Sequence, residues 1–293
     1  MSAAVEIQTR EDGPPPKRRR IAAPAKSRTT ANIDLANHCE HDGDGLERLI
    51  SALRKKKKIV VIAGASISVS AGIPDFRSST GLFAIFGGQH KLQASGKHLF
   101  DASVYKHDSS TQSFYRMVCE LAQMTSDAKP TPFHYMLVSL ASEGRLMRLY
   151  TQNIDSLDTR MPPLTTAIPL NAKGPWPTTI QLHGGLENME YTERDRVRTI
   201  SGKQSCGIGR LRPRIVLYNE CNPDAEAIGK VSEADLRNVP DAVIVVGTSL
   251  KIPGVRTLIN LDPKPQGSEF ENYWDFIVYG RCDDVANLVN LPR

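Results

Sequence analysis

Two neighbouring segments combine small residues with groups that can bind phosphate. The first is Gly64-Ala65-Ser66-Ile67-Ser68, and the second is Gly72-Ile73-Pro74-Asp75-Phe76-Arg77-Ser78. Small residues let a backbone approach a pyrophosphate, and a helix that begins there directs its N–H groups at the phosphates. The first segment lacks the G-x-G-x-x-G pattern and by itself equally predicts a tight strand–helix turn. The second adds a carboxylate acceptor, an apolar ring and a cation, so the two together favour a phosphate-containing ligand.

Three later segments carry further groups that could do chemistry. Thr151-Gln152-Asn153-Ile154-Asp155 offers amides and a carboxylate that can bind a ribose and fix a water, although an Asx-type helix cap would use the same residues. Gln181-Leu182-His183-Gly184 places a histidine beside a glycine. Because an imidazole titrates near neutral pH, His183 could act as a general base, although a lone histidine is more often structural. Gly247-Thr248-Ser249 adds small, hydrogen-bonding residues.

The elements that would position these groups alternate along the chain. Ile59–Ala63 is a continuous apolar run, typical of a strand buried on both faces. Similar patterns predict strands at 146–150, 214–218, 242–246, 258–261 and 276–279, and helices at 111–124, 133–142, 223–238 and 283–290. This alternation predicts an α/β fold with a doubly wound, parallel, Rossmann-like sheet. Ligands of such sheets bind beyond the carboxyl ends of the strands, where we expect the motifs to lie.

Charge is unevenly distributed along the 293 residues. Residues 1–58 hold 13 basic and 8 acidic side chains, whereas residues 59–293 hold 24 of each. A nucleic-acid groove would place the excess within the folded body, so we expect no direct nucleic-acid-binding groove. The longest apolar stretch, from Ile59 towards Ile73, is interrupted by serines and is too short to cross a membrane. The first 16 residues lack an apolar secretion signal.

Residues 1–45 are rich in Pro, Ala, Ser, Thr and charge without apolar periodicity, and we expect a disordered basic leader. Within it, Pro14–Arg20 predicts a nuclear import signal or a nucleic-acid-binding arm, or else is a solvated charge run. The cysteines form no C-x-x-C pair, which favours a reducing compartment without disulfides. They are Cys39, Cys119, Cys206, Cys221 and Cys282.

In this order, the motifs resemble the sirtuins, the NAD-dependent protein-lysine deacylases of the silent information regulator family. The resemblance runs from about Ile59 to Asp284 and includes Leu211-Arg212-Pro213 and Ile259-Asn260-Leu261-Asp262. Residues 210–220 look most like the fungal nuclear branch that deacetylates histones. The resemblance implies a catalytic domain over 46–293, in which 184–211 is a shortened remnant of the lobe that normally binds zinc.

The resemblance also implies roles for individual residues. His183 would be the general base for a ribose hydroxyl, while Asn153 and Asp155 would orient the ribose and a water. The residues implied in NAD binding are Gly64, Ala65, Ser66, Ile67, Ser68, Gly72, Ile73, Pro74, Asp75, Phe76, Arg77, Gln152, Asn153, Ile154, Asp155, Gly247, Thr248, Ser249, Asn260 and Cys282. Among these, the resemblance puts the phosphates near Ala65, Ser66, Arg77, Thr248 and Ser249, the nicotinamide near Ile73, Asp75 and Phe76, and the adenosine near Asn260 and Cys282.

Three features depart from the family pattern. Ser66 occupies the position of a usual second glycine, and its Cβ is expected to weaken cofactor binding. The family carries two C-x-x-C pairs between the catalytic histidine and the Leu-Arg-Pro strand, but that segment holds only Cys206, so we predict no metal site and no bound zinc. Only nine residues separate Thr248 from Leu258, which is too short for a usual parallel crossover. The last two features look like internal deletions.

The sequence therefore predicts a nuclear NAD-dependent protein-lysine deacetylase without bound zinc. It would transfer an acetyl group to the ADP-ribose of NAD, release nicotinamide and act in chromatin silencing. Its partners would be acetylated lysine peptides or histones and, through the leader, the import machinery. One alternative is a catalytically impaired, sirtuin-like NAD-binding protein or splice variant. Another is a basic chromatin-binding module with an incidental nucleotide fold.

Overall fold

The computed structural model describes residues 30–35, 43–89, 96–191, 211–248, 257–260 and 274–291. Its largest element is a seven-stranded sheet in the order β1-β9-β8-β7-β2-β3-β4, and every neighbouring pair is parallel. The strands are β1 (Ala31–Asp34), β2 (Ile59–Ala63), β3 (Leu146–Thr151), β4 (Thr179–Gln181), β7 (Ala242–Val246), β8 (Thr257–Asn260) and β9 (Phe276–Tyr279). The predicted α/β fold with a parallel sheet is confirmed.

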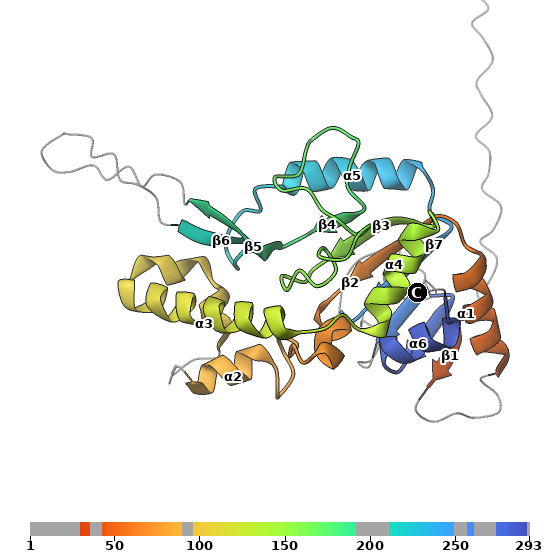
Figure 1. The fold of residues 1–293 in the computed structure, drawn as a ribbon, viewed down its shortest axis with the longest axis horizontal. Helices are drawn as coiled ribbons and strands as arrows, with labels where there is room; N and C mark the ends of the chain where they lie inside the picture. Colours follow the sequence, from red (N-terminus) through yellow and green to blue (C-terminus); the bar gives the residue numbers. More distant parts are fainter. Residues whose placement is uncertain are drawn as a thin grey trace, which may run out of the picture.

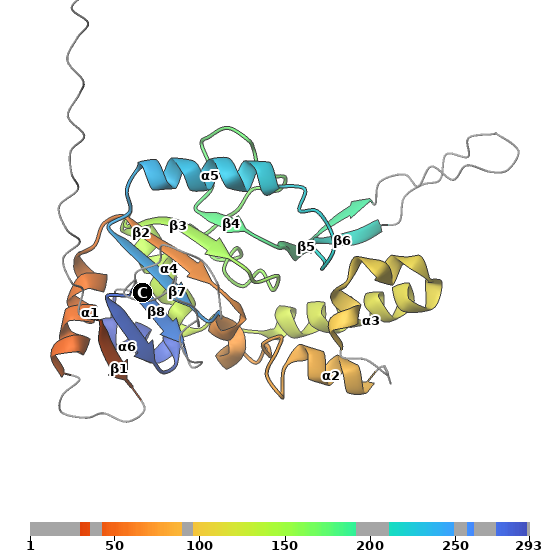
Figure 2. The ribbon, with the colours of Figure 1, turned by 180° about the vertical axis from the view of Figure 1, so that it is seen from behind.

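Helices lie on both faces of this sheet (Figures 1 and 2). One face carries α1 (Gly43–Lys55), α4 (Pro132–Ser142) and α6 (Cys282–Val289), and the opposite face carries α5 (Ala225–Arg237). This two-sided cover is what a doubly wound sheet requires, because each face is apolar. Among the described residues, no helix is both long and apolar enough to cross a membrane.

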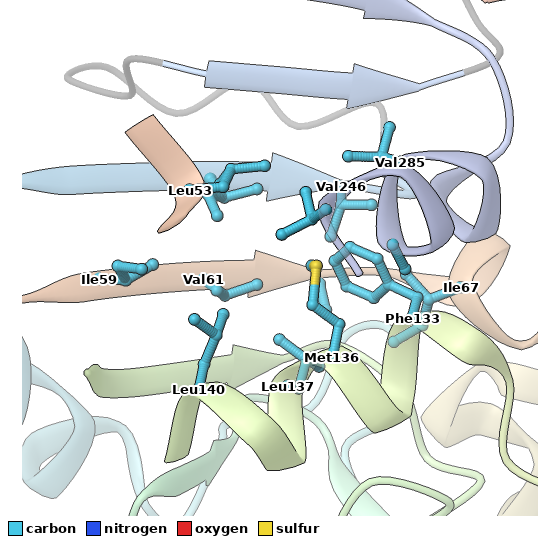
Figure 3. Close-up of a cluster of buried hydrophobic side chains, with 14 of the residues drawn as sticks. Leu53, Ile59, Val61, Ile67, Phe133, Met136, Leu137, Leu140, Val246 and Val285 are labelled. Atoms are coloured by element: carbon cyan, nitrogen blue, oxygen red, sulfur yellow. The ribbon is translucent and has the colours of Figure 1, made fainter. Parts of the chain in front are cut away.

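Strand β2 shows why its apolar run is continuous. Ile59 and Val61 pack in the core under α1, α4 and α6, and Figure 3 shows them close to Leu140 of α4. Val60 points to the other face and packs with Val231 of α5. Successive side chains of a strand alternate between faces. A strand covered on both sides is therefore apolar at every position.

A second group of elements lies beside the sheet and packs around its own apolar cluster. The helical module consists of α2 (Leu82–Gln89), α3 (Asp108–Asp127) and the 3₁₀ helices η3 (Gly96–Phe100) and η4 (Ala102–Lys106). An antiparallel hairpin of β5 (Gly184–Tyr191) and β6 (Leu211–Ile215) lies against it. The strand predicted at 214–218 for the parallel sheet is thus misplaced, since it ends at Ile215 and pairs within the hairpin. Its apolar residues Ile215 and Leu217 pack against the helical module, which local spacing alone does not reveal.

The predicted disordered leader is too long. Residues 31–34 form β1 at the edge of the sheet, with Ile33 fully buried, and α1 begins at Gly43. The prediction of disorder up to residue 45 is therefore wrong for these residues. A four-residue strand that depends on backbone pairing with β9 carries no periodicity that a sequence could show. Residues 1–29, including Pro14–Arg20, lie outside the described residues.

Strands β7 and β8 are parallel neighbours although only residues 247–256 lie between them. The expectation that this connection is too short for a parallel pairing is wrong. An extended chain of this length reaches about 33 Å, whereas returning along a short strand and crossing to its neighbour spans only about 20 Å. Residues 249–256 lie outside the described residues.

Candidate functional site

The site lies where the order of the strands reverses. From β2 the chain continues to β3 and β4 on one side, while from β7 it continues to β8 and β9 on the other. The carboxyl ends of β2 and β7 therefore flank a topological switch point, where ligands of such sheets bind. The Gly64 N–H donates to the Val246 carbonyl at 3.0 Å and fixes the two strand ends together.

Glycine is required at both strand ends. A Cβ on Gly64 would lie 2.6 Å from the Gly247 carbonyl oxygen and 2.6 Å from Thr248 Cβ. Gly247 itself has a φ of +65°, in the left-handed region that favours glycine. The predicted motifs at 64–68 and 247–249 are thus brought into direct contact at residues 64, 247 and 248, while Ser249 lies outside the described residues.

The segment after β2 folds into a 3₁₀ helix, η2 (Ala65–Ala71), which ends at Gly72 with a φ of +88°. The Ser66 N–H donates to the Gly247 carbonyl at 3.3 Å, which fixes the start of this turn beside β7. Ala65 and Ser66 are half-buried, whereas Ile67 and Ser68 are fully buried. The small residues of this motif therefore form the edge of the switch point.

The loop from Ile73 to Gly81 is fixed by its own side chains. Asp75 Oδ1 accepts hydrogen bonds from the backbone N–H groups of Arg77 at 2.8 Å and Ser78 at 2.7 Å. The Phe76 ring packs edge-on against Phe83 and Phe100, with centroids 5.8 and 5.3 Å away. In the same loop Pro74 is half-buried and Arg77 is exposed, while its first residue, Ile73, is buried. The carboxylate and the ring thus hold this loop against the helical module.

The segment after β3 connects β2 to β7. The Gln152 N–H donates to the Ala63 carbonyl at 2.9 Å, and its side-chain Oε1 accepts from the Thr248 hydroxyl at 3.1 Å. Asn153 is buried, with its Nδ2 3.4 Å from Ser68 Oγ. Within the described part of the chain, Asn153 Oδ1 has no hydrogen-bond partner. A buried amide oxygen without a partner is costly, which favours a ligand hydroxyl or water at this position.

His183 lies between β4 and β5 and is exposed. Its Nδ1 is 3.1 Å from the Gln152 carbonyl oxygen. Because a carbonyl can only accept, this bond places the ring proton on Nδ1 and leaves Nε2 with a lone pair in the neutral imidazole. The backbone is held as well, since the Val216 N–H donates to the His183 carbonyl at 2.9 Å. The geometry presents an oriented, accessible base beside the loop of Gln152 and Asn153.

A buried histidine from α4 lies near the site, and sequence reasoning missed it. His134 Nδ1 accepts from the Thr131 backbone N–H at 3.3 Å, and the Thr131 hydroxyl contacts both this ring and the Ile67 carbonyl. Burial lowers the pKa of His134, although the charges of Asp155 and Asp283 oppose the shift. The ring is therefore a neutral link between α4 and η2. A histidine three residues after a threonine cap was the available signal.

Asp283, at the beginning of α6, contacts η2 and α4, and the sequence analysis did not identify it as a candidate site residue. Asp283 hydrogen-bonds to the Ser70 hydroxyl, and its Oδ1 accepts from the Phe133 N–H at 3.0 Å. The predicted Cys282 is therefore brought close to η2. Burial, with the Asp283 charge, raises the pKa of the Cys282 thiol to about 12, so the thiol is neutral.

One residue of the predicted site and the remnant of the zinc lobe are described incompletely or not at all. Asn260 is the last residue of β8, and the structure describes its backbone only. Cys206 lies in the segment 192–210, outside the described residues. Ile154 and Asp155 are buried in the loop after β3. Gly64, Gln152, Gly247 and Thr248 meet at the ends of β2, β3 and β7, and the Gln152 carbonyl contacts His183.

Comparison with known proteins agrees with this arrangement. The model of the Sir2 family matches residues 64–254. The NAD-dependent protein deacetylase hst4 of Emericella nidulans is 47% identical over 98% of this chain and 56% of its own length. The protein of the same name from Schizosaccharomyces pombe is 43% identical over 88% of this chain and 72% of its own length. The NAD-dependent histone deacetylase HST4 of Saccharomyces cerevisiae is 38% identical over 81% of this chain and 76% of its own length.

Solved structures support the same fold. A Sir2 homologue in complex with NAD has a TM-score of 0.62 at 20% identity, covering 90% of this chain and 96% of its own. A Sir2 complex with a p53 peptide and NAD⁺ has a TM-score of 0.57 at 23% identity, covering 83% of this chain and 96% of its own. The fold, with its switch point, is that of a doubly wound α/β protein. The chain belongs to the Sir2 family.

Proposed function

We propose that this protein is an NAD-dependent protein-lysine deacetylase whose substrates are acetylated histones. The observation that carries the proposal is the exposed His183, whose Nδ1 is 3.1 Å from the Gln152 carbonyl oxygen, which orients the ring beside the loop after β3. The names of its relatives support it, since these are protein and histone deacetylases. The chain spans 56% of the Emericella nidulans relative, so the proposal concerns the domain described above.

The residues present fit NAD. Gly64 lets the chain pass close to Gly247 and Thr248 at the edge of the switch point, and Asn153 Oδ1 offers a buried acceptor that has no partner among the described residues. Bound NAD would supply an electrophilic ribose carbon, release nicotinamide and accept the acetyl group on its ADP-ribose. Ala65, Ser66, Arg77, Thr248 and Ser249 would bind the phosphates, and Asn260 and Cys282 would contact the adenosine.

The chain's own residues would divide the remaining work. His183 Nε2 would remove a proton from a ribose hydroxyl, which makes that oxygen nucleophilic toward the acetyl carbon. Asn153 and Asp155 would orient the ribose and a water, while Ile73 and Asp75 would hold the nicotinamide carboxamide. Phe76, anchored between two other aromatic rings, would shield the reactive ribose.

A structural zinc does not fit this chain. Cys206 is the only cysteine between residues 184 and 211, whereas the site of the family needs four thiolates. Within the described ranges, no three His, Cys, Asp or Glu side chains form a group that could hold a metal. We therefore also propose that the hairpin lobe is shortened and folds without zinc. Pro14–Arg20 would direct the protein to the nucleus, where it would act in chromatin silencing.

The test follows nicotinamide release from NAD with an acetyl-lysine histone peptide. We expect wild-type turnover, a loss of at least about 10²-fold in His183→Ala, and normal turnover in His107→Ala, an exposed histidine at the start of α3. Binding of NAD without turnover in the wild type would contradict the proposal and support the alternative of a catalytically impaired NAD-binding protein. Equal turnover in wild type and His183→Ala would contradict the role of the histidine.

A further inference from the structure

The segment that follows β6 holds the backbone on both sides of His183. The Val216 N–H donates to the His183 carbonyl at 2.9 Å, and the Asn222 side chain donates from Nδ2 to the Leu182 carbonyl at 2.8 Å. These carbonyls belong to the two peptide groups that flank the Cα of the histidine. Because peptide groups are planar, fixing both of them fixes the two soft dihedral angles of this residue and the direction of its side chain.

The residues after β3 hold the same histidine from the other side. The Leu182 N–H donates to the Thr151 carbonyl at 2.8 Å, and the ring Nδ1 lies 3.1 Å from the Gln152 carbonyl oxygen. The groups that Val216, Thr151 and Gln152 contribute are all backbone groups. Of these four contacts to the histidine segment, only that of Asn222 comes from another residue's side chain, so it is the one that a substitution can remove.

The orientation of the Asn222 amide is determined by its two partners. Its Oδ1 accepts from the backbone N–H of Asp224 at 2.9 Å, and its Nδ2 faces the Leu182 carbonyl. A backbone N–H can only donate and a carbonyl can only accept, so the oxygen and nitrogen of the amide cannot be exchanged. The half-buried Asn222 therefore bridges the residue before α5 and the backbone before the histidine.

The support for Asn222 is itself anchored to the hairpin. Arg214 of β6 binds both carboxylate oxygens of Asp224, at 2.7 and 3.1 Å, and Asp224 Oδ1 also accepts from the Leu170 N–H at 3.2 Å. Directly after the histidine, a Cβ on Gly184 would overlap the Arg214 carbonyl oxygen, so β6 lies against this segment. A side chain whose own position is fixed by hydrogen bonds can hold a reacting group in one geometry.

We propose that Asn222 is a positioning residue for the deacetylase reaction: it fixes the peptide group before His183, so that the ring keeps its Nδ1 proton on the Gln152 carbonyl and presents Nε2 as the base. The inference rests on the proposed function. Asn222→Asp tests the contact at constant size. The carboxylate keeps an acceptor for the Asp224 N–H but places a second acceptor against the Leu182 carbonyl, which leaves that carbonyl without its donor.

The first experiment measures kcat and KM with NAD and an acetyl-lysine histone peptide. Asn222→Asp and Asn222→Ala should each lower kcat at least about tenfold, because a displaced base is costly, while the KM for NAD changes less than about twofold. Asn171→Asp, at an exposed asparagine between β3 and β4, makes the same change of charge and should behave as the wild type. Unchanged kcat in both Asn222 variants would overturn the proposal.

A double variant separates positioning from a general structural effect. In the His183→Ala background, Asn222→Asp should lower the residual kcat less than about twofold, because a residue that acts through the histidine has nothing left to position. A further loss as large as in the wild-type background would show that the two residues act independently, and the proposal would be wrong.

The tautomer of His183 distinguishes failure of this inference from failure of the proposed function, because its measurement needs no turnover. Nitrogen NMR spectra of histidine-labelled protein are recorded at about pH 8.5, where imidazoles are neutral, and the His183 signals are assigned by their loss in His183→Ala. The wild type and Asn171→Asp should carry the proton on Nδ1, and Asn222→Asp should show a mixture of both tautomers. Signals of His134, buried in α4, should stay constant and report an intact fold.

The same single tautomer in wild type and Asn222→Asp would overturn the inference even if the enzyme is active. A wild type without turnover, together with the expected change of tautomer in Asn222→Asp, would contradict only the proposed function and the kinetic consequence drawn from it.

Discussion

Gly64 shows how one residue fixes the geometry of the site. The nearest atoms to a Cβ at this position belong to the backbone of Gly247 and to Thr248 Cβ, both 2.6 Å away, so neither can move without shifting β7. A side chain here would separate the two strand ends that flank the proposed NAD phosphates. The requirement is steric and holds whatever the reaction.

Gly64→Ala should therefore weaken NAD binding by at least about tenfold, since the strand ends must shift by several tenths of an ångström. Titration calorimetry with NAD gives the measurement. The control is Gly229→Ala on α5, where a Cβ meets nothing within 4 Å and should stabilise the helix by about 0.5–1 kcal/mol. Unchanged NAD affinity in Gly64→Ala would contradict the placement of the phosphates beside this glycine.

The chemistry of individual residues was predictable only where it lay in local motifs. The residues after β2, β3 and β7 could be identified as candidate ligand-binding residues because each group of small and polar residues follows an apolar run. His134 was missed because its role depends on burial, and the sequence shows only an ordinary polar residue. The sequence identified Asp75 and Phe76 as candidate site residues. It did not show that Asp75 fixes its own loop or that Phe76 packs against the helical module.

At the scale of elements, ion pairs connect the two strands of the hairpin. We define the hairpin ion-pair cluster as Glu190, Arg212, Arg214, Glu220 and Asp224. Arg212 is bound by both oxygens of Glu220, and Arg214 by both oxygens of Asp224. The Arg212 guanidinium also lies 5.0 Å from the centre of the Tyr105 ring on η4, which connects the hairpin to the helical module.

Glu220→Gln should destabilise the protein by about 3 kcal/mol, because it leaves the buried guanidinium of Arg212 without its main counter-charge. Denaturant unfolding provides the measurement. Glu233→Gln removes one member of an exposed pair with Arg237 and should change stability by less than about 0.5 kcal/mol. Equal stabilities for Glu220→Gln and the wild type would show that the hairpin ion-pair cluster does not hold the hairpin.

The elements themselves were predictable where burial on both faces imposes a pattern. Strands β2, β7 and β9 match their predicted ranges because each is an apolar run within the sheet. Strand β6 was assigned to the wrong sheet, because its apolar residues serve the helical module. Strand β1 was missed because its pairing with β9 depends on backbone groups, which every sequence has.

At the scale of the whole molecule, the fold should not depend on metal. The purified chain should contain less than about 0.1 zinc per molecule, since a single cysteine between residues 184 and 211 cannot complete a four-thiolate site. Metal analysis by mass spectrometry, with the melting temperature before and after a chelator, provides the test. One tightly bound zinc per chain, or unfolding by the chelator, would contradict this account.

The excess of basic residues in the N-terminal part of the chain also affects the whole molecule, because it predicts nuclear import. Removing residues 1–29 should leave NAD binding unchanged, because every described site residue follows residue 63, but should abolish nuclear accumulation of a fluorescent fusion. Changing Lys17, Arg18, Arg19 and Arg20 to alanine is the narrower variant and should have the same effect. A fusion that remains nuclear after both changes would contradict the import prediction.

The fate of the acetyl group tests the central claim most directly. The purified chain is incubated with NAD and a histone peptide whose acetyl-lysine carries an isotopic label, and all products are quantified by mass spectrometry. The account predicts equal amounts of nicotinamide, deacetylated peptide and ADP-ribose bearing the labelled acetyl group, all lost in His183→Ala. Labelled free acetate formed without consumption of NAD, or no deacetylated peptide despite NAD binding, would contradict it.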